Sequence, residues 1–73
     1  MKIKAIERRK LFVSASEYEN IYKAMNNPRT YFCKINGNDY FLAEVNMISS
    51  NLYEVVFVSS NEIEIDMEVI KNE

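Results

Sequence analysis

The fold of this chain is decided by residues 52–58, which read LYEVVFV. Apolar side chains occupy both faces of this stretch, and only Glu54 interrupts them. A strand that is apolar on both faces is typical of the centre of a sheet. We therefore expect a central strand here. Its two faces need cover from a helix on one side and from a curled sheet or a partner on the other.

On both sides of this strand, polar turn clusters separate segments whose apolar residues recur with a period of two. The clusters occupy residues 36–39, 49–51 and 59–61. They predict further strands over residues 30–35, 40–48 and 62–70. Tight turns between consecutive strands make neighbours antiparallel.

The N-terminal third predicts one strand and one helix. Residues 2–13 are rich in β-branched and aromatic residues, but the alternation breaks near the charged run at residues 7–10, which predicts a bend or bulge. Ser14 and Ser16 each precede a glutamate by three residues, so either can cap the helix that follows. Pro28 ends this helix. Its apolar stripe consists of Tyr18, Ile21, Tyr22 and Met25.

Together these elements predict an α+β fold with the order β-α-β-β-β-β. One amphipathic helix packs on a curled, mostly antiparallel five-stranded sheet. The 73 residues suit a single small globular domain over residues 1–73. A hydrophobic content of 48% and a charged content of 27% are typical of globular chains.

The composition argues against an enzyme. The chain has no His, no Trp and one Gly. Without imidazole there is no Ser-His-Asp or Cys-His catalysis, and one glycine cannot build a phosphate-binding loop. We expect no catalytic residues, no cofactor and no metal.

The single cysteine, Cys33, cannot form an internal disulfide, which favours a reducing compartment. No stretch reaches the roughly 20 apolar residues of a membrane span, and the N-terminus lacks the apolar segment of a signal peptide. We expect a cytoplasmic protein that does not contact a membrane. Cys33 itself is expected to be a small buried hydrophobe.

Charge divides the chain in two. Residues 1–34 contain eight basic and three acidic residues, whereas residues 35–73 contain one basic and eight acidic ones. The simplest explanation is pairing of the first strand with the last, so that Lys2 or Lys4 opposes Glu64 or Glu68. The alternative is that the carboxylates of the last strand form a binding surface, because they repeat every 6.6 to 6.8 Å or so along a strand. Such a row suits the basic groove of a nucleic-acid-binding enzyme.

These features predict a non-enzymatic binding protein that acts by occupying a protein partner. High Lys, Asn, Ile, Glu and Tyr usage is typical of AT-rich bacterial or phage genomes, so we expect an inhibitor from a phage or mobile element. Two surfaces are expected to bind. The acidic row comprises Glu62, Glu64, Asp66 and Glu68. The apolar patch comprises Leu42, Ile48, Val56 and Val58.

Two alternatives remain open. The first is a homo-oligomer, for example a homodimer, that sequesters a small ligand at its subunit interfaces. The second is a nucleic-acid-binding module that uses the basic N-terminal segment. The negative net charge of −2 makes nucleic acid the weaker candidate. Its contacts would come from Lys2, Lys4, Arg8, Arg9 and Lys10, with Tyr31, Phe32, Tyr40 and Phe41 stacking on bases.

Overall fold

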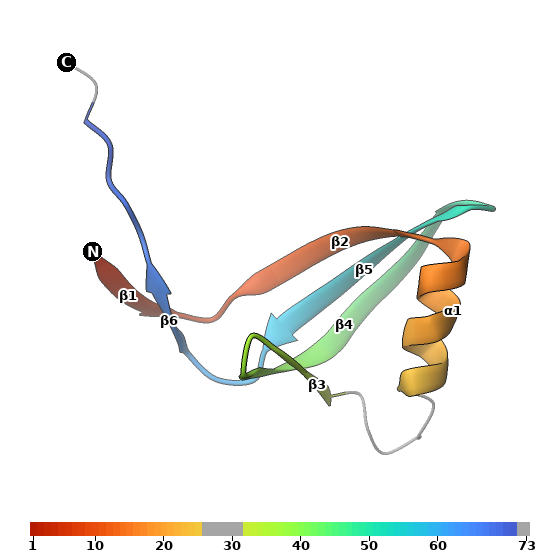
Figure 1. Cartoon of the computed structure of the whole chain (residues 1–73), viewed down its shortest axis with the longest axis horizontal. Coiled ribbons are helices and arrows are strands. Elements are labelled where there is room, and N and C mark those ends of the chain that lie inside the picture. The colour runs from red at the N-terminus through yellow and green to blue at the C-terminus, as the bar shows by residue number, and fades with distance from the viewer. Residues whose placement is uncertain (26–31, 72–73) are drawn as a thin grey trace.

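The computed structural model describes residues 1–25 and 32–71, and these contain one helix and six strands. The strands form two antiparallel sheets, one with the order β2-β5-β4-β3 and one with the order β1-β6 (Figure 1). The elements are β1 Lys2–Ala5, β2 Arg8–Ser14, α1 Ala15–Ala24, β3 Phe32–Ile35, β4 Asn38–Ser49, β5 Leu52–Ser59 and β6 Ile63–Asp66. The predicted α+β class is confirmed. The predicted single five-stranded sheet is wrong, because the strands divide between two sheets that do not close.

The central strand of the larger sheet is β5, which lies between β2 and β4. Val55 and Val56 point to opposite faces of this strand, and both are fully buried. Both faces of β5 are therefore covered, as predicted for residues 52–58. We call the face that carries Val55 and Phe57 the helix face and the face that carries Val56 and Val58 the far face.

The helix lies against the helix face over β2 and β5 (Figure 1). Of the two candidate serines, Ser14 is the N-cap, and its Oγ accepts a hydrogen bond of 3.2 Å from the backbone N–H of Glu17. Most of the predicted apolar stripe packs on the core of Tyr40, Val55 and Phe57. The exception is Tyr22, which is 57% exposed. Residues 26–28, where the sequence predicts the end of the helix, lie outside the described residues.

Two bulges in β4 change which side chains face the core. The pairing of β4 with β5 passes from Leu42 opposite Phe57 to Glu44 opposite Val56, so Ala43 is an extra residue. A second shift, between Met47 and Ser49, leaves Ile48 without a direct partner. Each extra residue reverses the alternation of the strand. Leu42 therefore lies on the helix face and Glu44 on the far face, although strict alternation predicts a shared face.

The first predicted strand is broken at Ile6 and Glu7 into β1 and β2, which belong to different sheets. The break coincides with the predicted bend, but it is complete. Strand β1 leaves the larger sheet and pairs with β6, with Lys4 opposite Glu64. The predicted pairing of the first and last strands is thus confirmed. We call β1 and β6 the arm, because they project from the rest of the molecule, which we call the body (Figure 1).

Replacement of Ser14 by Ala should lower the free energy of unfolding by about 1 kcal/mol, because the N–H of Glu17 loses its acceptor at the helix start. Urea unfolding measures this difference. Ser16→Ala is the matched control, since Ser16 is not the N-cap. Equal effects of the two substitutions would contradict the assignment of the cap.

Candidate functional site

The acidic row lies on the arm, where it is partly neutralised. Glu64 and Asp66 share one face of β6 with the neighbouring lysines of β1. Lys2 Nζ lies 3.3 Å from Glu64 Oε1, and the amino group of Met1 lies 3.7 Å from Asp66 Oδ1. These side chains remain more than half exposed, so each pair contributes at most about 1 kcal/mol. The cross-strand pairing expected from the charge asymmetry is therefore present.

The two ends of the acidic row lie outside β6. Glu62 precedes the strand and Glu68 follows it, and both side chains are exposed. Within the described residues, neither carboxylate forms an ion pair. The arm thus carries two compensated carboxylates between two that interact with solvent.

The opposite face of the arm is apolar. Ile3 lies opposite Ile65, and Ala5 lies opposite Ile63, with all four side chains partly buried. Ile63 also contacts the core of the body, so the base of the arm is packed against the larger sheet.

The structure does not bring the predicted apolar patch together. The bulge at Ala43 places Leu42 on the helix face, where it packs against the core. Val56 and Val58 lie on the far face, and Val56 is fully buried. Ile48 stands apart at the second bulge and is 53% exposed. One continuous patch is therefore not formed.

Charged side chains on the far face help to bury Val56. Lys10 and Glu44 lie directly opposite Val56 on the two neighbouring strands. Arg8 Nη2 lies 2.8 Å from Glu44 Oε2, and Lys10 Nζ lies 3.9 Å from Glu54 Oε2. The aliphatic stems of such side chains cover apolar surface while their charged ends stay in water. This cover could not be read from the β5 sequence alone.

Most cations of the basic N-terminal segment are paired with carboxylates of the same chain. Arg8, Lys10 and Lys2 each contact a carboxylate, as described above, and Arg9 contacts Glu7 at 2.9 Å. Phosphates would have to compete with these carboxylates for the cations. Among the aromatic residues considered for base stacking, Tyr40 is buried, Phe32 and Phe41 contact each other, and Tyr31 lies outside the described residues.

The junction between the arm and the body contains a polar cluster that the sequence did not predict. Tyr40 donates a hydrogen bond of 2.6 Å to Glu7 Oε1, and Arg9 donates two more, of 2.9 and 3.1 Å, to the same oxygen. The hydrogen bond from Tyr40, followed by that from Arg9, lowers the pKa of Glu7. The bond to Glu7 and, next, burial raise the pKa of Tyr40.

Hydrogen bonds from backbone groups also stabilise this junction. The N–H of Glu7 donates to Ser59 Oγ at 2.8 Å, and the N–H of Ser59 donates to the carbonyl of Glu7 at 2.9 Å. Glu7 and Tyr40 are 33 positions apart in the chain. Their contact arises from the order of the strands, which the sequence pattern does not encode. The one sequence signal for the cluster was the carboxylate of Glu7 at the start of a basic run.

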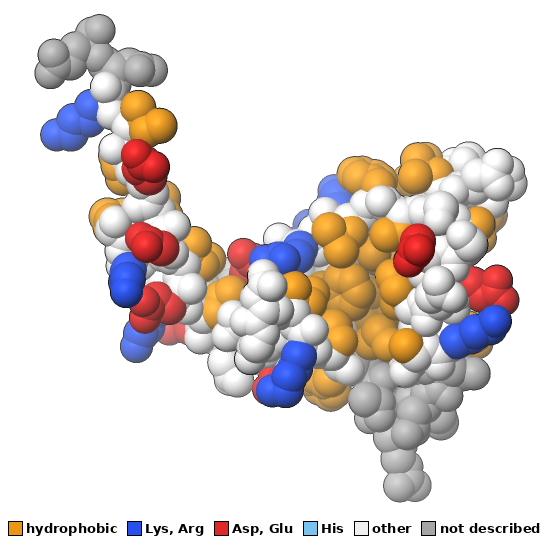
Figure 2. Space-filling view, in the orientation of Figure 1, with side chains coloured by type: hydrophobic (Ala, Val, Ile, Leu, Met, Phe, Trp, Pro, Cys, Tyr) orange, Lys and Arg blue, Asp and Glu red, His pale blue; other side chains and the backbone are white. Residues whose placement is uncertain are grey.

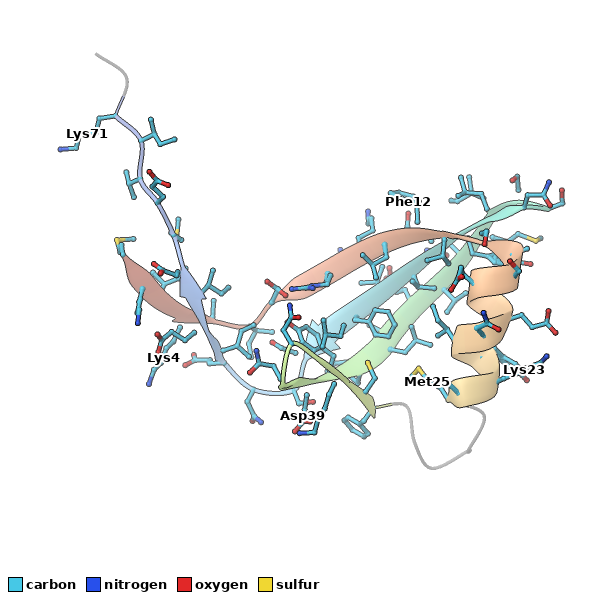
Figure 3. The ribbon with its side chains drawn as sticks, in the orientation of Figure 1. Lys4, Phe12, Lys23, Met25, Asp39 and Lys71 are labelled. Atoms are coloured by element: carbon cyan, nitrogen blue, oxygen red, sulfur yellow. The ribbon has the colours of Figure 1, made fainter. Side chains whose placement is uncertain are left out.

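A pocket of about 340 Å³ lies on the helix face of the body. Its walls come from α1, from β5 and from the two edge strands β2 and β3, which means that the sheet curves around it. Figure 2 shows hydrophobic side chains in the hollow between the sheet and α1, and Figure 3 shows Met25 and Lys23 on opposite sides of the helix. The lining residues are Arg9, Leu11, Ile21, Ala24, Met25, Cys33, Ile35 and Phe57.

Cys33 is the one cysteine of the chain, and it lies in this pocket as a partly buried side chain. Burial raises the pKa of its thiol, so the unreactive thiol predominates at neutral pH. The sequence predicts that Cys33 is a small buried hydrophobe; it packs against the core, but it is only partly buried.

The described residues hold no group of three or more potential metal ligands. In the same part of the chain, no helix has the length and apolar character needed to cross a membrane. The features of the described residues considered as candidate binding sites are the arm, the junction and the pocket.

Replacement of Tyr40 by Phe should raise the pKa of Glu7, because it removes the strongest of its hydrogen bonds. Because the pKa of Glu7 is lowered in the folded state, its carboxylate stabilises the fold at pH values above its ordinary pKa of 4.5. This stabilisation is lost as the pH falls through the folded-state pKa. The free energy of unfolding should thus fall less between about pH 7 and about pH 3 in Tyr40→Phe than in the natural chain.

Urea unfolding at both pH values measures this difference. At neutral pH, Tyr40→Phe should also cost about 1.5 to 3 kcal/mol, the usual range for a hydrogen bond to a charged group. Tyr53→Phe is the control, because Tyr53 lies near the other end of β5 and contacts Tyr18. An unchanged pH dependence in Tyr40→Phe would show that Glu7 is not held by this bond.

Comparison of the chain with protein-family models, with curated proteins and with solved structures finds no match. The function is therefore argued from the residues and their arrangement.

Proposed function

We propose that this chain is a non-enzymatic binding protein that acts by occupying a protein partner. The observation that carries the proposal is the arm, which holds exposed carboxylates away from the body (Figures 1 and 2). A projecting element can enter a groove of a partner without displacing any part of its own core. The absence of His from the chain supports a role without catalysis.

The construction of the arm supports the same role. Two strands alone are marginally stable in water, and three or more strands, or packing on another element, are needed for stability. Only Ile63, at the base, packs against the core of the body. The arm therefore gains stability when a partner covers its apolar face.

The charges of the arm define the partner it suits. Glu62 and Glu68 are exposed at the two ends of the acidic row, and the surface pairs of Glu64 and Asp66 are weak enough to exchange. Such a surface favours a partner with a basic groove, as found in enzymes that bind nucleic acid. Inhibition of such an enzyme, in a phage or mobile-element setting, is the specific role that we propose.

The alternative of direct nucleic-acid binding receives less support. Four of the five cations that it requires, Lys2, Arg8, Arg9 and Lys10, contact carboxylates of the same chain. Binding through these cations would fall steeply with salt concentration. Nucleic acid that is retained by the immobilised chain and released by salt would favour this alternative.

Neutralising the acidic row should weaken partner binding. The tagged chain is used to capture proteins from bacterial lysate, and the captured protein is identified by mass spectrometry, purified and titrated by calorimetry. The double variant Glu62→Gln, Glu64→Gln should bind about tenfold more weakly or worse, because attraction to a basic surface is lost. Neutral amides avoid the repulsion that lysines would create beside Lys2.

The matched control is Glu17→Gln, Glu19→Gln, which removes the same charge from α1. It should leave the affinity unchanged. Equal affinity in both double variants would remove the acidic row from the binding surface. Failure of the chain to capture any protein would overturn the proposed function.

A further inference from the structure

Strand β3 forms an open edge of the larger sheet next to the pocket. It pairs with β4, and no other strand of the described residues pairs with it. Cys33 and Ile35 line the pocket, so Phe32 and Lys34 lie on the far face. A strand added beside β3 would therefore send every second side chain toward the pocket.

The backbone groups of Lys34 point toward this open edge. The carbonyl of Asp39, directly opposite Lys34, accepts a hydrogen bond of 2.9 Å from the N–H of Ser60, so it points away from β3. Pairs in an antiparallel ladder alternate between bonded and non-bonded, which makes this a non-bonded pair. The N–H and C=O of Lys34 are thus directed outward, and so are those of Phe32, two residues earlier.

The residues after β6 have a complementary arrangement. We call residues 67–71 the tail, and Figure 1 shows that it continues the line of β6 away from the body. The N–H of Met67 donates a hydrogen bond of 2.7 Å to the carbonyl of Met1, and the amino group of Met1 donates one of 2.8 Å to the carbonyl of Met67. The backbone N–H and C=O of Met67 therefore point toward β1. By alternation, Glu68 and Ile70 direct their groups to the other side. Val69 and Ile70 are 61% and 77% exposed.

We propose that the tail of a second copy of this chain adds to the open edge of β3 as an antiparallel strand. The backbone groups of Glu68 and Ile70 then meet the outward groups of Lys34 and Phe32. In this register the pairs are Met67 with Ile35, Glu68 with Lys34, Val69 with Cys33 and Ile70 with Phe32.

Side-chain chemistry agrees with this register at each position. Val69 and Met67 enter the apolar pocket, whose described lining has one charged group, Arg9, already bonded to Glu7. On the far face, the Glu68 carboxylate meets the Lys34 ammonium, which also lies 3.1 Å from Asp39 Oδ1 in an exposed pair that is weak enough to exchange. The exposed side chain of Ile70 meets that of Phe32. Among the described residues that line the pocket, Arg9 is bonded to Glu7, and the rest offer no charged group to orient a small ligand. A strand is oriented by its own backbone.

Reciprocal exchange of tails produces a closed dimer with two identical contacts. Each contact involves a few residues, so the dimer is weak and its population depends on concentration. The inference does not rest on the proposed function, because it concerns the purified chain alone.

Cys33 provides a direct test, because it is the only natural thiol. Val69→Cys should place a second thiol directly across from it, within the Cα separation of roughly 4.4 to 6.8 Å that a disulfide needs. Mild oxidation of the full chain should give a covalent dimer, and peptide mapping should find Cys33 joined to the introduced thiol. Tyr22→Cys is the control, at a similarly exposed apolar position on α1, and it should give no link to Cys33.

The open edge is tested by Lys34→Pro, which removes the outward N–H but no bond to β4. Light scattering over micromolar to millimolar concentrations should show a dimer for the natural chain and a monomer for this variant. Lys34→Ala keeps the N–H and should retain at least part of the dimer. Ala24→Trp, which fills the pocket, should also be monomeric, whereas Glu19→Trp on the solvent side should not. A natural chain that stays monomeric without the Cys33 link, or a dimer that survives Lys34→Pro and Ala24→Trp, would overturn the proposal.

Discussion

The carboxylate of Glu7 is the group on which the arrangement of this protein depends. It lies where the chain passes from β1 to β2, and its oxygen accepts hydrogen bonds from Tyr40 of β4 and from Arg9 of β2. Its backbone is bonded to Ser59, at the end of β5. One residue therefore joins three strands of the body at the point where the arm departs. A charged group can be retained at such a partly buried position because three donor groups, from Tyr40 and Arg9, are directed to its oxygen.

Much of the architecture follows from periodicity and composition. The two apolar faces of residues 52–58 required a covered central strand, and β5 is that strand. The period-two segments and polar turns located β3, β4 and β5 as antiparallel neighbours. The predicted strand over residues 62–70 is shorter, Ile63–Asp66, and it pairs with β1 instead of β5. The opposite charges of the chain ends indicated their pairing, and Lys4 does oppose Glu64. Each of these features depends either on local sequence pattern or on charge, and both can be predicted from the sequence.

Other features depend on contacts that periodicity does not encode. Ala43 and Ile48 are unremarkable residues in an apolar run, yet each shifts the register of β4 and moves its neighbours to the other face. The expected apolar patch failed for this reason, and because ion pairs cover Val56. The pocket needs two edges of one sheet to approach the same helix. Such arrangements arise from the curvature of the sheet, which no single segment determines.

The bulges of β4 have an evolutionary consequence. An extra residue bends a strand and increases its local twist, which helps to curve the larger sheet around its helix face. Strands β2 and β3 are the two edges of this sheet, and both line the cavity. The concave surface of this protein is thus tied to single-residue changes in length rather than in side-chain identity. Relatives that gain or lose this cavity should differ by insertions or deletions within β4, while the residues that line it stay the same.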